Sequence, residues 1–439
     1  YHGTATEAFE KLDRRHREIH AGLDANKAAY RKFLEDSSSA IVSAKAALES
    51  CSRSFDIRKL AACTHGDTNT FYILCGWMTE KDALAFQKDI QNDEKIFCLM
   101  EDQQAPAKKK PPTKLKNPKL FKPFEMYVKM YGLPAYNEMD PTWFVAITYS
   151  FIFGAMFGDV GQGLILFLGG LFLYKTKHMD LAGIISCAGV FSVFFGFMYG
   201  SFFGFEDVLK AIWLKPMNQM MDVPLVGRLN AVFVIAIGFG MFIILICMIF
   251  NIINSIRNKD TEKAWFDSNA VAGFVFYGSI VLTVGLFISG RKLPATAVLV
   301  VMFGVPLLLM FLKEPLTNLV EKKSEIFPEQ KGMFFVQSFF ELFEVLLSYL
   351  SNTLSFLRIG AFAVSHAAMM EVVLMLAGAT NGGSPNWIVV VLGNIFVCAM
   401  EGLNVGIQVL RLEYYEIFSR FYAGNGREFK PFMKAAHKN

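Results

Sequence analysis

An arginine inside the longest apolar run of this chain limits what the chain can be. The residues around Arg358 read LFEVLLSYLSNTLSFLRIGAFAVSHAAMMEVVLMLAG, a stretch apolar enough to lie in a membrane. A charge at that depth costs about 2.5–3.5 kcal/mol on insertion scales, so it is rare unless it serves a site. Arg411 ends the next apolar run. Two such arginines on neighbouring spans suggest a path for ions or another charged solute.

The uneven distribution of charge divides the chain into two parts. Hydrophobic residues make up 53% of the 439 residues and charged residues 19%, which is too apolar for one soluble domain and too charged for a chain wholly in lipid. Charges concentrate in residues 1–130, whereas the long apolar runs fall within 141–421. We therefore expect a soluble domain followed by a polytopic membrane domain. The small net charge of +4 does not suggest nucleic acid as a partner.

The soluble part is expected to contain an arm and a lobe. In residues 1–67 charges alternate and apolar positions are sparse, which predicts a solvated helical hairpin or coiled-coil arm. Residues 68–104 predict a small α/β lobe: a strand in TNTFYILCGWM, a helix capped by Thr79, and a second strand in KIFCLMED. The Pro- and Lys-rich residues 105–140 predict a linker, and residues 141–439 a membrane domain with a C-terminal tail.

Eight apolar segments are candidate membrane helices. They cover residues 142–157, 163–174, 181–199, 229–256, 265–289, 295–312, 332–376 and 387–421. As one unbroken helix, residues 332–376 would exceed about 60 Å at ~1.5 Å per residue, so this segment must tilt strongly or project beyond the bilayer. Long tilted helices suit contact with a curved partner.

The loops between these segments predict the orientation. An even number of spans puts both ends of the membrane domain on one side. With the Lys-rich linker placed inside, the cytoplasmic loops hold nine basic residues and the opposite loops hold five. Because cytoplasmic loops are enriched in Lys and Arg, this asymmetry predicts that both termini are cytoplasmic.

The last two segments each carry one polar face. At 100° per residue, the seventh segment aligns Glu344, Ser348, Ser351, Ser355, Arg358 and His366, and leaves Glu371 on the opposite face. On the eighth segment, a single arc contains Glu401, Asn404, Gln408 and Arg411. If these faces meet, they would line a water-filled cavity and relay protons.

Structural interpretations of the same residues stay open at this stage. The two arginines could be salt-bridged or could snorkel to an interface, and His366 could be a packing histidine. The turn GDVGQG lacks the Lys-Ser/Thr that follows a phosphate-binding loop, so a tight turn or close helix packing is expected there. The sequence shows no Ser/His/Asp or Cys/His pattern and no metal-ligand spacing among its seven cysteines, so we expect neither a cofactor, a metal nor a catalytic site.

Three long motifs resemble one protein family. The stretches PFEMYVKMYGLPAYNEMDPTWFVAITYSFIFGAMFGDVGQG, LSNTLSFLRIGAFAVSHAAM and MEGLNVGIQVLRLEYYEIFSRFYAGNGREFKPF are similar to the large membrane subunit, called a or I, of rotary V-type and archaeal-type ATPases. The resemblance implies a cytoplasmic arm bound to peripheral stalk subunits and eight membrane helices, the last two tilted against a ring of proteolipid subunits. The Leu-Trp typical of eukaryotic members after the arginine is missing, so the chain resembles a prokaryotic member in the plasma membrane. The family's distal lobe is missing too, and the chain begins at Tyr1 rather than Met, so we expect it to lack an N-terminal part.

The resemblance also implies roles for individual residues. Arg358 matches the essential arginine that faces the ring carboxylate, and Arg411 matches its partner on the last helix. His366 and Glu401 match polar residues of the half-channels, and Glu344 falls where the family carries an acidic residue. We therefore expect a stator subunit that couples H⁺ or Na⁺ flow to rotation, with ATP chemistry carried by other subunits. The alternatives are a secondary transporter whose arginines bind an anionic substrate, and a purely structural membrane anchor.

Overall fold

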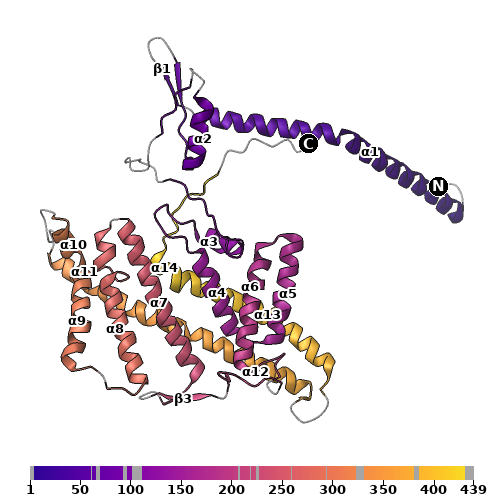
Figure 1. Ribbon diagram of the computed structural model, residues 1–439. Helices are drawn as coiled ribbons and strands as arrows, with labels where there is room; N and C mark the ends of the chain where they lie inside the picture. The colour runs from indigo at the N-terminus through magenta and orange to yellow at the C-terminus, as the bar shows by residue number, and fades with distance from the viewer. Residues whose placement is uncertain are drawn as a thin grey trace. The chain divides into compact units, whose positions relative to one another are not determined.

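The computed structural model describes most of the chain (Figure 1). The described residues are 4–60, 62–65, 70–91, 96–100, 111–205, 208–217, 219–223, 227–258, 260–292, 294–322, 331–379 and 385–430. They belong to two compact units. One comprises Tyr1–Pro106 with Lys430–Asn439, and the other comprises Ala107–Phe429, the membrane unit.

The first unit is dominated by one continuous helix, α1 (Ala5–Leu60), rather than a hairpin. Its described side chains are exposed or half-buried, so the helix has no core of its own to pack on. Strands β1 (Ala62–His65) and β2 (Thr70–Ile73) pair antiparallel. Helix α2 (Glu80–Ile90) begins where predicted, because the Thr79 hydroxyl accepts a hydrogen bond of 3.3 Å from the Asp82 amide.

One predicted strand of the lobe is wrong. The described residues 96–100, in the middle of KIFCLMED, form no strand. A short run of apolar residues favours a strand only where a neighbouring strand takes up the backbone hydrogen bonds. The β1–β2 pair, in contrast, includes a strand at Ala62–His65 that the sequence pattern did not indicate.

The membrane unit is almost entirely helical. Its α-helices are α3 (Glu125–Tyr131), α4 (Thr142–Met156), α5 (Val160–Lys177), α6 (Asp180–Tyr199), α7 (Ala231–Arg257), α8 (Val271–Ile288), α9 (Thr296–Phe311), α10 (Lys313–Val320), α11 (Lys331–Ser355), α12 (Leu357–Leu376), α13 (Trp387–Leu412) and α14 (Ser419–Phe421). Shorter elements are the 3₁₀ helix η1 (Lys122–Phe124), the π-helices η2 (Glu262–Phe266) and η4 (Glu413–Phe418), and the hairpin of β3 (Met220–Val223) with β4 (Gly227–Asn230).

Each of the eight apolar segments coincides with helix, and the protein is a helical membrane protein. Among the described residues, five helices are long and apolar enough to cross a membrane, or six if the bent pair of α9 and α10 is one span. That pair is bent by 74°, which the sequence pattern did not predict. Pro315 in the first turn of α10 has no backbone N–H to continue the ladder of α9, which accounts for the break. The number of eight spans stays a prediction.

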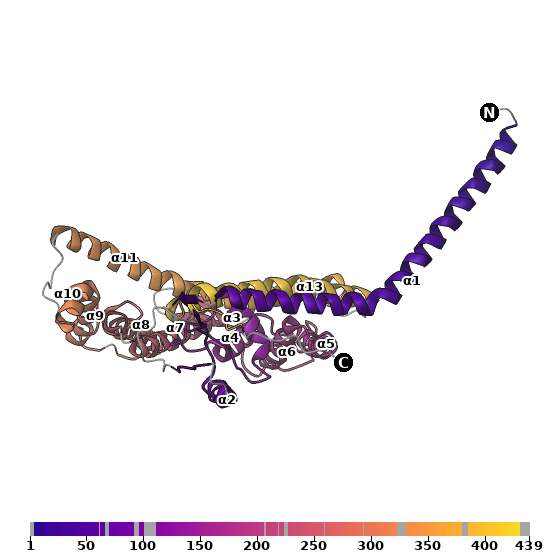
Figure 2. The same ribbon diagram turned by 90° about the horizontal axis from the view of Figure 1, so that it is seen from above.

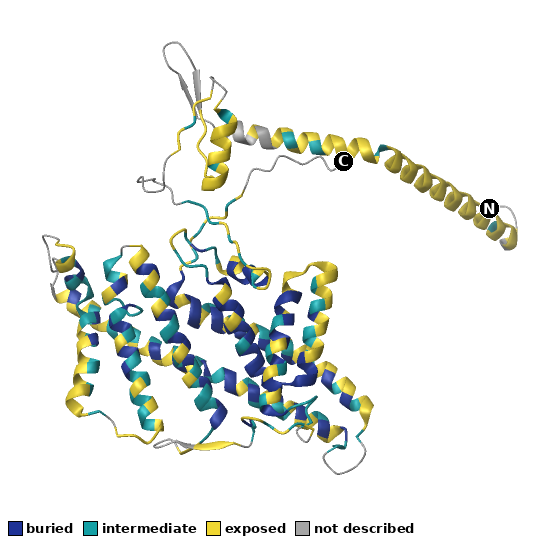
Figure 3. Ribbon diagram, viewed as in Figure 1, coloured by how far each residue is buried: buried dark blue, intermediate teal, exposed yellow. Residues whose placement is uncertain are grey.

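Glycines allow α4, α5 and α6 to pack closely. A Cβ added at Gly154 would lie 2.5 Å from the backbone of Phe191, and one at Gly189 would lie 2.5 Å from the amide of Phe167. In membranes such small residues let helix backbones approach where larger side chains would hold them apart. Figure 3 shows the buried residues gathered in the middle of the membrane unit, around α4, α6 and α7.

The seventh predicted segment is interrupted at Phe356. This fully buried side chain separates α11 from α12, and its ring occupies the space that a Cβ would need at Gly240 of α7. The break therefore has a packing partner and is fixed in position. Figure 1 shows α12 and α13 sloping across the more upright helices, and Figure 2 shows α11 and α13 along one side of the membrane unit.

Candidate functional site

Arg358 lies two residues after the break, in the first turn of α12. Its Nη2 donates a hydrogen bond of 2.8 Å to the Ser355 hydroxyl at the end of α11. The same Nη2 lies 3.8 Å from Oε1 of Glu416, and the Ser355 hydroxyl donates to that oxygen. Ser355 therefore bridges the guanidinium and the carboxylate. The Arg358 side chain is 20% exposed and that of Glu416 8%, so the pair opens to the surroundings on the arginine's side.

Glu416 belongs to the π-helix η4, a segment in which the sequence analysis identified no site residue. A π-helix accommodates about one extra residue per turn, and such turns occur frequently at functional sites. Here it follows α13 directly and buries both of its carboxyl side chains, Glu413 and Glu416. Glu413, Glu416 and Arg420 are spaced i, i+3 and i+7, which in an α-helix would place them on one face. That spacing is the signal that would have found them.

Arg420, which follows the π-helix, is a buried arginine. It is 6% exposed, it donates a hydrogen bond of 2.9 Å from Nη1 to Oδ1 of Asn269, and its guanidinium lies 5.4 Å from the centre of the Tyr349 ring. Its Nη2 lies 3.4 Å from the Ser348 hydroxyl on α11. Arg420 thus ties the end of the last span to α11 and to the segment before α8.

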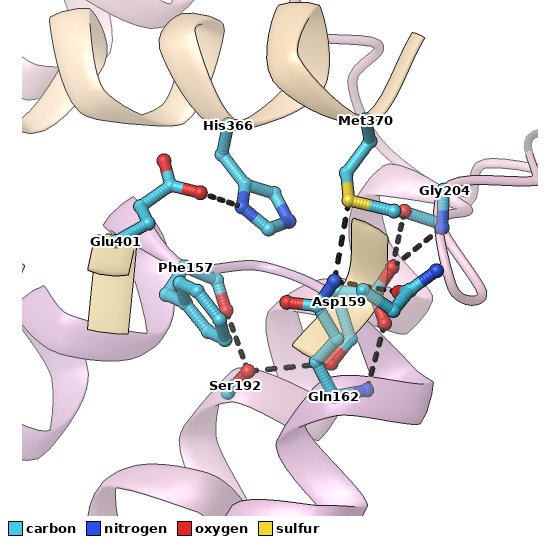
Figure 4. Close-up of polar contacts among 10 residues, drawn as sticks. Phe157, Asp159, Gln162, Ser192, Gly204, His366, Met370 and Glu401 are labelled. Carbon is cyan, nitrogen blue, oxygen red and sulfur yellow. Dashed lines mark hydrogen bonds and ion pairs between the residues drawn. The ribbon is translucent and has the colours of Figure 1, made fainter. Parts of the chain in front are cut away.

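A second polar pair lies deeper in the helix contact. His366 of α12 and Glu401 of α13 are each 3% exposed, and Nδ1 of the imidazole lies 2.6 Å from Oε2 of the carboxyl group (Figure 4). The Phe157 ring packs against the imidazole with the ring centres 4.7 Å apart. The structure therefore joins one residue from each of the two polar faces that the helical projection placed on the seventh and eighth segments. Within the described residues, Nε2 of His366 and Oε1 of Glu401 have no hydrogen-bond partner.

Asp159 organises the loop beside this pair, and the sequence analysis missed it. Its carboxylate caps α5 by accepting from the Gln162 amide, and it also accepts from the Ser201 hydroxyl at 2.7 Å and from the Phe203 and Gly204 amides. Asp159 is fully buried. The motif GDVGQG is therefore a helix cap and a tight turn, as its missing Lys-Ser/Thr predicted.

Gln162 connects this turn to the last span. Its side-chain amide donates a hydrogen bond of 2.8 Å to Asn394 of α13 and lies 3.2 Å from the sulfur of Met370 on α12 (Figure 4). Met370 also lines a cavity of about 20 Å³, together with residues that include Ser201, Gly204 and His366. A site of that size holds about one water molecule, and the hydroxyl and imidazole are suitable partners for it.

The remaining predicted site residues are more exposed than His366 and Glu401. Glu344 and Asn404 are exposed, and Gln408 is half-buried. None of these three makes a side-chain hydrogen bond within the part of the chain that the structure describes. Arg411 is exposed at the end of α13, close enough for its charge to act on both Arg358 and Glu416. The polar face of the seventh segment is therefore exposed at Glu344 and buried at His366, with the break at Phe356 between them.

This arrangement is suited to moving protons or ions rather than to covalent chemistry. It places fixed positive charge beside carboxylates at one level of the helices, and an imidazole–carboxyl pair beside a water-sized space at another. Across the described ranges, no three His, Cys, Asp or Glu side chains converge in a way that would hold a metal ion.

Comparison with known proteins gives a consistent result. Residues 2–223 and 312–434 match the V-type ATPase 116kDa subunit family. The chain is 28% identical over 390 residues to the A-type ATP synthase subunit I of Pyrococcus horikoshii, a match covering 83% of this chain and 54% of that protein. It is 26% identical over 401 residues to the A-type ATP synthase subunit I of Methanocaldococcus jannaschii, covering 84% of this chain and 56% of that protein. The chain spans about half the length of the curated relatives it matches.

Proposed function

The chain belongs to the V-type ATPase 116kDa subunit family, and on that premise we propose that it is the ion-translocating stator subunit of a rotary ATPase. The observation that carries the proposal is Arg358, a partly exposed arginine at a packed break between two apolar helices, with a buried carboxylate 3.8 Å away. A purely structural anchor would not need a charge at this depth, where charges are costly and serve ion pathways.

The face beside Arg358 suits a partner made of apolar helices. Exposed apolar side chains follow α11 and α13, among them Phe339, Phe343, Leu350, Leu392, Phe396 and Leu403. Figure 2 shows α11 and α13 along one side of the membrane unit, so these side chains are available to a partner on that side. We assign to it a ring of proteolipid subunits, each carrying a carboxylate that passes Arg358 as the ring turns.

The guanidinium sets the protonation state of the passing carboxylate. Arginine stays protonated at any accessible pH, and a nearby positive charge favours the ionised form of a carboxyl group. A ring carboxyl group is thus ionised beside Arg358 and must take up a proton, or a sodium ion, before it moves into lipid. The same fixed positive charge opposes a direct leak of cations between two offset water-filled half-channels.

The two polar clusters divide between these half-channels. We assign the His366–Glu401 pair, with Asn404 and the cavity at Ser201, to the channel on the outer side. Glu344, Ser355, Gln408 and Arg411 belong with Arg358 to the cytoplasmic channel and to the zone between the channels. This assignment follows the distribution of basic residues in the loops, which supports cytoplasmic termini. The helical arm α1, which lacks a core, is suited to binding the peripheral stalk subunits.

A cross-linking experiment tests the proposal. In the purified complex, a cysteine at Leu403, a side chain that is 67% exposed on α13, should cross-link to a small membrane subunit. The matched control is a cysteine at Leu168, 54% exposed on α5, which should give no such product. The unsubstituted chain controls for the seven native cysteines. No product at Leu403, or equal products at both positions, would contradict the proposal. Uptake of an anionic solute by the chain reconstituted alone would favour a secondary transporter instead.

A further inference from the structure

The contact between Arg358 and Glu416 is an indirect one. The closest nitrogen–oxygen distance is 3.8 Å, longer than a hydrogen bond, and the Ser355 hydroxyl mediates the approach. The strong arrangement of an arginine and a carboxylate is bidentate, with two parallel N–H···O bonds. Glu416 therefore compensates the charge of Arg358 without a direct hydrogen bond to the guanidinium.

Both partners keep unused hydrogen-bonding capacity. Nη1 of Arg358 and Oε2 of Glu416 are buried, and neither has a partner among the described residues. A buried donor or acceptor without a partner costs free energy that a better-matched partner would recover. Arg358 thus has reason to exchange Glu416 for a carboxylate that binds it directly, and its exposed side is where such a group would arrive.

We propose that Glu416 is the resting counter-ion of Arg358, which each carboxylate of the ring displaces on arrival and which reclaims the arginine when that carboxylate leaves. The proposal rests on the stator function argued above. Glu416 acts through Arg358 and is a positioning residue. Its physical effect is on release, because a ring carboxylate that leaves an uncompensated arginine in an apolar setting must overcome the whole attraction between the two charges.

The substitution Glu416→Gln keeps the shape of the side chain and its contact with Ser355 but removes the charge. Without that competing charge the ring carboxylate should stay bound longer. We expect ATP-driven turnover of the assembled complex to fall roughly tenfold or more, the effect of losing one opposite charge at close range. The number of ions moved per ATP should stay unchanged, because the half-channels and Arg358 are intact. Glu416→Asp, which keeps the charge on a shorter side chain, should fall between Gln and the unsubstituted chain.

The matched control is Glu413→Gln, three residues earlier in the same π-helix, also buried but without a contact to Arg358 among the described residues. Its turnover should equal that of the unsubstituted complex. Slow turnover with intact coupling in Glu416→Gln alone supports the proposal. Normal turnover in Glu416→Gln, or fewer ions per ATP as expected of a merely structural role, overturns it. If the Glu416→Gln complex does not assemble, the Glu416→Asp complex is measured instead. A turnover of Glu416→Asp equal to that of Glu413→Gln overturns the proposal.

A parallel Arg358→Ala complex separates this inference from the function beneath it. If Arg358→Ala pumps ions, the stator proposal itself fails. If Arg358→Ala is inactive while Glu416→Gln matches Glu413→Gln, the stator proposal stands and only the role of Glu416 is wrong.

Discussion

His366 and Glu401 share one hydrogen bond of 2.6 Å across the contact between α12 and α13, and both side chains are almost completely buried. Because each is the hydrogen-bond partner of the other, the two side chains act as a unit. Loss of either leaves the other buried without its partner, which is costly for a carboxyl group and for an imidazole.

We predict that His366→Ala and Glu401→Gln each slow ion transport by about tenfold or more, the size of effect seen when a proton-transfer group is lost. The double substitution should be no worse than the more severe single one, because the pair fails as a unit. Ion flux in vesicles, normalised to assembled complex, measures this. Glu371→Gln, which alters an exposed carboxylate on the opposite face of α12, should be close to normal. Fully additive losses in the double variant would show that the two residues act separately.

Asp159 is predicted to be a stability determinant. Replacing it with Ala removes the α5 cap and the acceptor for Ser201, Phe203 and Gly204, and should destabilise the chain by about 1–3 kcal/mol. Thermal unfolding in detergent measures the change. Asn386→Ala, which removes an exposed cap from α13, should cost clearly less because water replaces it. Equal losses in the two variants would contradict a special role for the buried cap.

Two adjacent glycines of α5 give a matched test of helix packing. A Cβ at Gly170 would lie 2.8 Å from both the Ala182 carbonyl oxygen and the Ser186 amide, whereas one at Gly169 meets nothing within 4 Å. Gly170→Ala should therefore destabilise the α5–α6 pair by about 1–3 kcal/mol. Gly169→Ala should be neutral or stabilising by up to about 1 kcal/mol, because alanine favours helix. Thermal unfolding of both variants measures the two changes in stability. A larger loss of stability in Gly169→Ala than in Gly170→Ala would refute the close approach of α5 and α6.

The orientation is tested by labelling. Cysteines at the exposed positions Asn386 and Asn425 flank the two ends of the last span. A membrane-impermeant thiol reagent applied to intact cells should label only Asn386→Cys, because the basic loops predict that Asn425 is cytoplasmic. In inverted vesicles the pattern should be the opposite. Labelling of Asn425→Cys in intact cells would show that the predicted topology is wrong.

Sequence reasoning succeeded where one physical signal dominated. Long apolar runs predicted the helices, and Thr79 predicted the start of α2, because hydropathy and capping act locally. Arg358 stood out because a charge in such a run is costly.

It failed where the outcome depended on distant contacts. Glu416 and Arg420 were missed as site residues because what gives them a role is contact with Ser355 and Asn269, which lie 61 and 151 residues away in the chain. The turn GDVGQG was expected to be a tight turn or a point of close helix packing, but Asp159 was not identified as a cap, because its partners Ser201 and Gly204 are some 40 residues away in the chain. The break at Phe356 has its cause on α7, where Gly240 leaves room for the ring.

The central claim is that Arg358 couples ion flow to rotation, and one measurement tests it most directly. ATP-driven ion uptake is measured in vesicles that contain the assembled complex with Arg358→Ala or Arg358→Lys. Both variants should assemble and fail to pump, because lysine keeps a charge but lacks the planar, always protonated guanidinium. Robust ATP-driven uptake by an assembled Arg358→Ala complex would contradict the account.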